Sequence, residues 1–351
     1  MIYIDKNRPE ILNTLNEYRQ RIECRITKKL NAQFCSNKNC KVCGSTKELS
    51  YKSTKTVENK IKKFLFTDKN LLNVICGEPK DIISLNDDFY KCVLTKTHYD
   101  QLDDYFKLTE KERKLGKYKV IYDLLVDISK GFDYDNWFTN LKSSDDYSGY
   151  HLAENLNLRS CAYCNRTYTT TIRDRKKGKL MRPQFDHWYP KSKFPLLALS
   201  FFNLIPSCYT CNSIVKSDTI LELKNHIHPY VDLEQTNEFS FGYFYVKSLD
   251  RYRVYIEYDK NKTIKAYNTL RLLKVDQMYN AHLPELSDLI KIKEAYSDTY
   301  IKKIQGLFPS IQLNKNEIHR ILFGTELDVK DFHKRPLSKF KSDILKKLEI
   351  I

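Results

Sequence analysis

Residues 185–192 read FDHWYPKS, and they lie between two cysteine pairs, CAYC at 161–164 and CYTC at 208–211. Two Cys-x-x-Cys pairs present four thiolates in the tetrahedral arrangement of a closed structural zinc site. The insertion between the pairs is longer than in most zinc ribbons, so two unrelated pairs of buried thiols are the alternative. A zinc ion would clamp the two ends of the insertion and contribute to its folding. We therefore expect structural Zn²⁺ at Cys161, Cys164, Cys208 and Cys211.

The insertion contains further short motifs in a fixed order. Asp186 and His187 are adjacent, SFFNLIP at 200–206 contains Asn203, and Asn212 directly follows the last cysteine. The whole arrangement resembles the HNH endonuclease family: Cys-x-x-Cys, Asp-His-x-x-Pro-Lys-Ser, Asn-Leu-x-Pro-x-Cys-x-x-Cys-Asn and a following lysine. More closely, it is similar to the bacterial branch that includes the HNH components of Septu-type anti-phage systems. The resemblance covers roughly residues 160 to 230, about a fifth of the chain.

These polar residues suit the hydrolysis of a phosphodiester. The reaction needs a base that deprotonates water and a cation that stabilises the charge of the transition state. Histidine has an ordinary pKa that lets it act as a base near neutral pH, and His187 is the candidate. A hard divalent cation such as Mg²⁺ or Mn²⁺ prefers oxygen ligands, which Asp186 and Asn212 would supply. The resemblance implies that Asn203 belongs to the catalytic set, where it orders the loop after His187 and holds that histidine in place.

The resemblance also implies a ββα-metal fold. In that fold a strand ends at Asp186 and His187, a second strand carries Asn203, and a helix begins near Cys211 and presents Asn212. Neighbouring residues of a regular strand point to opposite faces. The first strand must therefore end, twist or bulge at residues 186–187 if both side chains are to serve one site.

Three lysines are candidate contacts for substrate phosphates: Lys191, Lys193 and Lys216. Lys216 follows Asn212 by four residues, whereas three is the commoner HNH spacing, so on an α-helix its side chain is rotated by about 100°. Lys191 and Lys193 are equally consistent with ordinary solvated residues. The same holds for the basic segment 173–182, which would also suit a DNA backbone.

The composition favours a polyanionic partner such as nucleic acid, because the 351 residues carry a formal net charge of +16. A lysine-rich surface without such a partner is the alternative. With 41% hydrophobic residues the chain can bury a core, and no apolar run is long enough for a membrane span. The N-terminal sequence lacks a signal peptide's features, so we expect a cytoplasmic protein whose ten cysteines are reduced or bind metal.

Changes in hydrophobic period predict an α+β architecture of three regions. Residues 1–150 are expected to form a mainly helical N-terminal region, residues 151–230 the zinc-clamped HNH unit, and residues 231–351 a β-hairpin with helices. The large helical flanks carry no catalytic motif of their own. They are where we expect a partner or substrate to be selected.

Within these regions the pattern predicts individual elements. Apolar residues spaced by three and four indicate N-terminal helices at 10–30, 57–66 and 108–129, followed by an irregular connection at 133–150. Alternation predicts hairpins over 166–185 and over 239–258. C-terminal helices are expected at 275–307, 315–322 and 336–348, with Pro336 in the first turn of the last one.

A second group of cysteines, Cys35, Cys40 and Cys43, has a metal-like spacing. Cys24 or a distant residue would have to supply the fourth ligand. Three cysteines without a clear partner are more often free thiols. Whether this group binds metal stays open at the level of sequence.

The motifs taken together favour an HNH endonuclease that cuts DNA. By resemblance, the cut leaves a 5′-phosphate and a 3′-hydroxyl, and a phage-defence role with an ATPase partner is implied. Taken singly, His187 would more often be a structural histidine, and Asn203 and Asn212 would more often be turn or cap residues. A non-catalytic zinc module that grips nucleic acid or protein would not need Asp186, His187 and Asn212. An RNase or toxin with the same site is a third reading.

Overall fold

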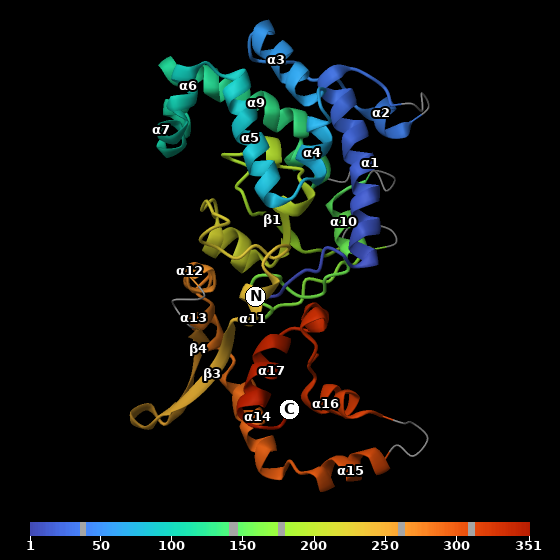
Figure 1. Cartoon of the computed structure of the whole chain (residues 1–351), viewed down its shortest axis with the longest axis vertical. Coiled ribbons are helices and arrows are strands. Elements are labelled where there is room, and N and C mark those ends of the chain that lie inside the picture. The colour runs from blue at the N-terminus through green and yellow to red at the C-terminus, as the bar shows by residue number, and fades with distance from the viewer. Residues whose placement is uncertain (36–39, 140–146, 175–179, 259–263, 308–312) are drawn as a thin grey trace.

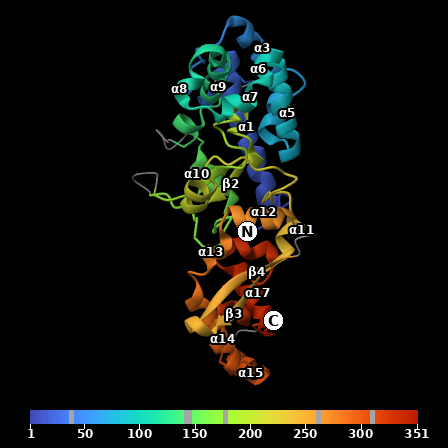
Figure 2. The same ribbon diagram turned by 90° about the vertical axis from the view of Figure 1, so that its left-hand side faces the viewer.

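The computed structural model describes residues 1–35, 40–139, 147–174, 180–258, 264–307 and 313–351. The molecule is elongated, with the N-terminal helices at one end and the C-terminal hairpin and helices at the other (Figure 1). The short strand β1 lies between the two ends, and a view turned by 90° shows the same order along the long axis (Figure 2). Helices and two small antiparallel sheets make up the regular structure of the described residues, as the mixed pattern predicts.

The N-terminal helices form because each buries one apolar stripe. In α1 the buried side chains recur every three or four residues, from Ile11 through Tyr18 to Leu30, so one face of the helix enters the core. The predicted helix at 108–129 is wrong in its continuity, because Gly116 has a φ of +54° and interrupts it. The elements of this region are α1 Pro9–Asn31, α2 Lys41–Ser45, α3 Lys55–Leu65, α4 Asn70–Cys76, α5 Pro79–Val93, α6 Lys96–Asp100, α7 Leu102–Lys107, α8 Glu110–Arg113, η1 Gly116–Tyr118, α9 Lys119–Phe132, η2 Tyr134–Phe138 and α10 Gly149–Leu156.

The central region is built on a two-stranded sheet. Strands β1 (Gln184–His187) and β2 (Leu204–Ser207) pair antiparallel, with Asp186 opposite Ile205 and His187 opposite Leu204. Asn203 was expected on the second strand, but it ends the short helical turn η4 (Phe201–Asn203) just before β2. The other elements here are η3 Pro195–Leu197 and η5 Thr210–Lys216.

The hairpin predicted over 166–185 is wrong in extent. Its described part contains two isolated bridges, Ser160 with Tyr168 and Ile172 with Met181, and β1 begins only at Gln184. The basic turn at 175–179 lies outside the described residues.

The C-terminal hairpin matches its prediction closely. Strands β3 (Phe239–Val246) and β4 (Arg251–Tyr258) pair along their whole length. The expected helix at 275–307 is three helices instead, because the chain turns after Tyr279 and Pro284 starts a new helix. Pro336 lies outside α17, because Leu337, with a φ of +62°, is the cap residue. The helices are α11 Leu233–Asn237, α12 Ile264–Leu272, α13 Val275–Tyr279, α14 Leu283–Ala295, α15 Asp298–Gly306, α16 Lys315–Phe323 and α17 Ser338–Lys347, with short turns η6 Lys247–Leu249 and η7 Val329–Lys334.

One continuous hydrophobic cluster runs through all three regions. The first residues of the chain reach the centre, where the Ile2 amide donates to the Ala162 carbonyl at 2.9 Å. None of the described helices is both long and apolar enough to cross a membrane. The region boundaries drawn from the sequence stay a prediction.

Candidate active site and metal centres

The four cysteines that the paired motifs single out converge on one point. The sulfurs of Cys161, Cys164, Cys208 and Cys211 all lie within 4.8 Å of one another, and all four residues are buried. Four thiolates around zinc at about 2.3 Å would stand about 3.8 Å apart, and Cys164 and Cys208 lie 3.9 Å apart. Backbone amides also donate to these sulfurs, as in zinc knuckles: that of Arg166 to Cys164 at 3.4 Å and that of Cys208 to Cys161 at 3.3 Å. The group can hold a zinc ion.

Asp186 is a buried carboxylate with two protein partners. Its Oδ2 accepts a hydrogen bond of 2.5 Å from the Tyr163 hydroxyl, and its Oδ1 lies 3.2 Å from the Lys216 ammonium. Burial raises the pKa of Asp186, while Lys216 and Tyr163 oppose that rise by favouring the charged form. Each carboxylate oxygen has a further lone pair that can contact a cation.

Lys216 lies inside the protein, against β1. Its side chain is 0% exposed, and its ammonium donates to Asp186 and, at 2.8 Å, to the His187 carbonyl. The contact with phosphate predicted for Lys216 stays a prediction, and the ammonium already has these two acceptors. Removing one partner of such a buried pair is strongly destabilising because the other charge is left without a partner.

The shape of η5 explains how Lys216, four residues after Asn212, can still point toward the same strand. Its hydrogen bonds skip five residues, as from the Ser217 amide to the Asn212 carbonyl at 2.8 Å, so η5 is a π-helical turn. A π-turn holds more residues than an α-turn, so the rotation expected on an α-helix does not apply. Asn212 contacts Gln184 and Lys216 contacts Asp186, which share one face of β1 because they are two residues apart.

His187 ends β1, and its ring turns toward the loop that follows. Its Nε2 lies 3.0 Å from the Ala198 carbonyl oxygen, and the Tyr134 ring packs edge-on against the imidazole with centroids 4.4 Å apart. A carbonyl oxygen only accepts, so Nε2 carries the proton and Nδ1 keeps a lone pair. Burial lowers the pKa of His187 to about 3, which leaves the ring neutral at physiological pH. Asp186 and His187 are neighbours at the end of β1, and both line one cleft.

Asn203 ties together the two ends of the loop between the strands. Its Oδ1 accepts from the Tyr189 amide at 2.7 Å, and its Nδ2 donates to the Tyr189 and Leu197 carbonyls at 3.1 and 2.9 Å. Leu197 directly precedes Ala198, whose carbonyl holds His187. The fully buried amide of Asn203 thus fixes the segment that orients the imidazole.

We expect Asn203→Ala to lower the free energy of unfolding by about 3 kcal/mol or more, because three buried backbone groups lose their partners. Any activity that depends on the orientation of His187 should fall as well. Urea unfolding and cleavage assays measure the two effects. Asn280→Ala is the matched control, because the Asn280 side chain also hydrogen-bonds to a backbone amide and carbonyl, those of Val254 on β4. Unchanged stability of Asn203→Ala would contradict the role we assign to this amide.

Asn212 lines the cleft, and its side-chain oxygen is a candidate metal ligand. Its Nδ2 donates to Gln184 Oε1 at 2.9 Å, which orients the amide, and no described hydrogen bond uses its Oδ1. Ser213 Oγ donates to the same Gln184 oxygen at 3.0 Å. Asp186 and Asn212 therefore form a set of oxygen donors on the wall of one cleft, the kind of ligand that Mg²⁺ and Mn²⁺ prefer.

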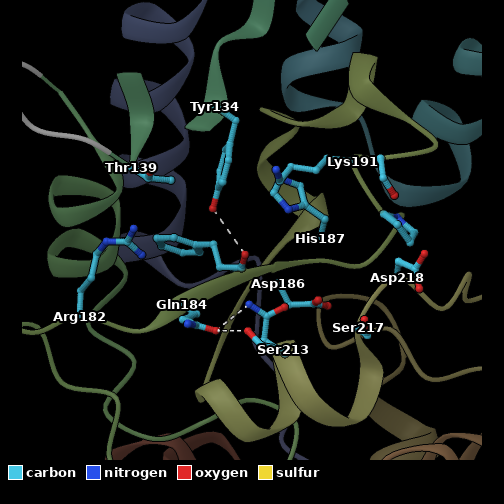
Figure 3. A pocket seen from close by; sticks show the side chains of 14 residues that line it. Tyr134, Thr139, Arg182, Gln184, Asp186, His187, Lys191, Ser213, Ser217 and Asp218 are labelled. Atoms are coloured by element: carbon cyan, nitrogen blue, oxygen red, sulfur yellow. Dashed lines mark hydrogen bonds between the residues drawn. The ribbon is translucent and has the colours of Figure 1, made fainter. Parts of the chain in front are cut away.

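The cleft itself has a volume of about 500 Å³. Asp186, His187, Lys191 and Arg182 are among the residues that line it (Figure 3). Lys191 forms an ion pair of 2.6 Å with Asp135, and its side chain is 37% exposed. Lys193 is not among the residues that line the cleft. Its backbone carbonyl accepts a hydrogen bond from the Tyr90 hydroxyl. The substrate roles of Lys191 and Lys193 stay predictions.

Several residues of this site carry no signal in the sequence. Tyr134 lies more than fifty positions before His187, and only the fold brings the two rings together. Tyr163 is the second residue between the two cysteines of the first Cys-x-x-Cys motif, where no sequence pattern predicts a hydrogen bond to Asp186. Gln184 could have been suspected, because it shares a strand face with Asp186 and precedes it by two residues. Asp218, which also lines the cleft, follows Lys216 in an irregular segment.

A second group of four cysteines converges elsewhere. The sulfurs of Cys24, Cys35, Cys40 and Cys43 also lie within 4.8 Å of one another. This group can hold a zinc ion as well.

No family model, no curated protein and no solved structure matches this chain.

Proposed function

We propose that this protein is a metal-dependent endonuclease of the HNH type that hydrolyses DNA phosphodiester bonds. The observation that carries the proposal is a histidine, held through one ring nitrogen, in the same cleft as two residues with oxygen donors. His187 donates through Nε2 to Ala198, and Asp186 and Asn212 line the cleft beside it. The motif order resembles the HNH family and supports the same assignment.

His187 would act as the general base. With its Nε2 proton engaged, the Nδ1 lone pair is the one that takes a proton from an attacking water. Burial lowers the pKa of the ring, so Nδ1 is unprotonated at neutral pH. Tyr134 and the loop pinned by Asn203 restrict the rotation of the ring. A positioned base contributes most when it is held in one orientation before the substrate arrives.

Asp186 and Asn212 would hold the divalent cation. Mg²⁺ or Mn²⁺ bound there would stabilise the negative charge that develops on the phosphate in the transition state. Tyr163 and Gln184 orient these two ligands through their hydrogen bonds. Such supporting contacts tune how well ligands bind a metal.

The charge of the chain suits a nucleic-acid substrate. Lys191 and Arg182 lie on the cleft wall, and the net charge is +16. Basic side chains at a cleft attract the phosphate backbone without reading its sequence. DNA is the substrate we propose, and the roles in phage defence and with an ATPase partner rest on the motif resemblance alone.

The test is the cleavage of supercoiled plasmid by the purified full chain with Mg²⁺, with Mn²⁺ and with EDTA. We expect nicked or linear product with either metal and none with EDTA. A labelled RNA of matched sequence, run in parallel, distinguishes an RNase that uses the same site. Cleavage that persists in EDTA would contradict the proposed cation. Tight DNA binding without cleavage of either nucleic acid would favour the non-catalytic module.

A further inference from the structure

The N-terminal helical region contains a cysteine cluster that the nuclease proposal does not use. Cys24 lies on α1, Cys40 and Cys43 lie at the start of α2, and Cys35 lies on the segment between the two helices. The sulfur of Cys24 is 2.9 Å from that of Cys43 and 3.6 Å from that of Cys40. A disulfide would bring two sulfurs to about 2.05 Å, and none of the ten cysteines forms one. Four thiols thus surround one point without being bonded to each other.

The local structure has little else to hold it together. The helix α2 has five residues, far too few to be stable alone. Cys43 is its only buried residue, so α2 contributes no apolar stripe to the core. Short segments that lack their own core are commonly held by a metal ion or a disulfide. A cluster of four thiols at the junction of α1 and α2 meets that need.

Basic residues stand close to Cys24 and Cys40 in the sequence, which suits a metal bound by thiolates. Zinc with four thiolates carries net negative charge, which nearby cations stabilise. Arg25 follows Cys24 directly, Lys28 lies one turn later on α1, and Lys41 follows Cys40. The spacing of the ligands, with a Cys-x-x-Cys pair at 40–43, is the spacing of a zinc knuckle.

We propose that Cys24, Cys35, Cys40 and Cys43 bind a second structural zinc ion, which fixes α2 against α1. This proposal does not depend on the nuclease activity. The ion would also affect the contacts next to α2. The hydroxyl of Thr46, the residue after α2, accepts a hydrogen bond from Arg25 at 3.2 Å. Arg25 also donates to Asp133 at 3.2 Å, so the ion would hold the corner where α1, α2 and the end of α9 meet.

The two zinc groups differ in exposure. Cys161, Cys164, Cys208 and Cys211 are all buried, whereas Cys24, Cys35 and Cys40 are partly exposed. Water and chelators therefore reach the second site more readily. We expect a mild chelator to remove its zinc first, well before the central ion is lost.

Native mass spectrometry of the full chain, purified without chelator, tests the proposal directly. The wild type should carry two zinc ions, and Cys40→Ser/Cys43→Ser should carry one. Cys92→Ser is the matched control, because Cys92 is exposed and belongs to neither group, and it should keep two. A double variant that carries as many zinc ions as the wild type would overturn the proposal.

A spectroscopic measurement on the wild type decides the question even if the double variant does not fold. Replacing zinc by Co²⁺ should give the visible absorption of tetrahedral cobalt thiolate sites, with an intensity for two sites per chain. Graded chelation should remove about half of it in a first step. A single step that occurs only under strong chelation, as expected of the buried central site, would argue against the second ion. A mass lower by two hydrogens, which indicates a disulfide in the cluster, would do the same.

Discussion

Replacing His187 by alanine should lower kcat/KM for plasmid cleavage by about 10²- to 10⁴-fold, the usual contribution of a positioned general base. The expectation rests on the single contact that fixes the ring. The Ala198 carbonyl accepts a hydrogen bond from the Nε2–H group, so Nδ1 is the nitrogen that can accept a proton from water. Alanine removes that lone pair and leaves Asp186 and Asn212 in place, so DNA and metal should still bind.

The measurement is single-turnover cleavage with saturating Mg²⁺, alongside zinc content and an unfolding curve. His319→Ala is the control for deleting a buried histidine, because His319 lies on α16 at the far end of the molecule (Figure 1). It should cut at nearly the wild-type rate. Added imidazole should restore part of the activity of His187→Ala and none to a metal-ligand variant such as Asp186→Asn. A folded, zinc-loaded His187→Ala that cuts as fast as wild type would exclude His187 as the base.

The elements with clean periodicity could be predicted from the sequence. Alternating aromatic residues predict the C-terminal hairpin to within about a residue, and the stripe on α1 predicts that helix. Two of the breaks were missed because each depends on one residue's backbone angle. Gly116 interrupts the helix expected at 108–129, and Leu337 adopts a left-handed conformation where Pro336 was expected to start a helix. The amide of Leu337 donates to the Asn165 carbonyl, a tertiary contact that no local pattern encodes.

The candidate site divides in the same way. The grouping of Cys161, Cys164, Cys208 and Cys211 could be predicted from cysteine spacing alone. Each Cys-x-x-Cys pair is a local motif, and two such pairs complete one metal site. The position of Lys216 could not be predicted, since a π-turn differs from an α-turn only in which carbonyl each amide selects.

The second cysteine group shows the limit most clearly. Three of its members were visible as a pattern, but the choice of Cys24 over a distant residue required the fold. Cys24 joins the group because the long helix α1 places it beside α2. Spacing predicts ligands within a loop, and tertiary packing decides the one that comes from elsewhere.

The largest loss of stability should come from the central cysteines. The knuckle at 161–165 connects all parts of the chain: Ile2 donates to Ala162, Tyr279 donates to the Cys164 carbonyl at 2.6 Å, and the Lys339 amide donates to Asn165. Zinc would hold this knuckle to Cys208 and Cys211, directly after β2. A structural zinc site contributes about 10 kcal/mol or more at neutral pH, comparable to the whole free energy of unfolding of a typical domain, about 5–15 kcal/mol.

We therefore expect Cys208→Ser/Cys211→Ser to lose one zinc, the cooperative unfolding transition and all cleavage, because the strand that pairs with β1 loses its anchor. The comparison that isolates this effect is Cys40→Ser/Cys43→Ser, which removes the same two thiols from the other group. That variant should also lose one zinc, yet keep the near-ultraviolet circular dichroism of the buried core around Trp188. If the central variant instead kept that signal and its activity, the central cysteines would be buried thiols rather than the clamp of the fold. Equal damage from both variants would mean that the two sites stabilise one cooperative unit, since a single hydrophobic cluster joins the regions they hold.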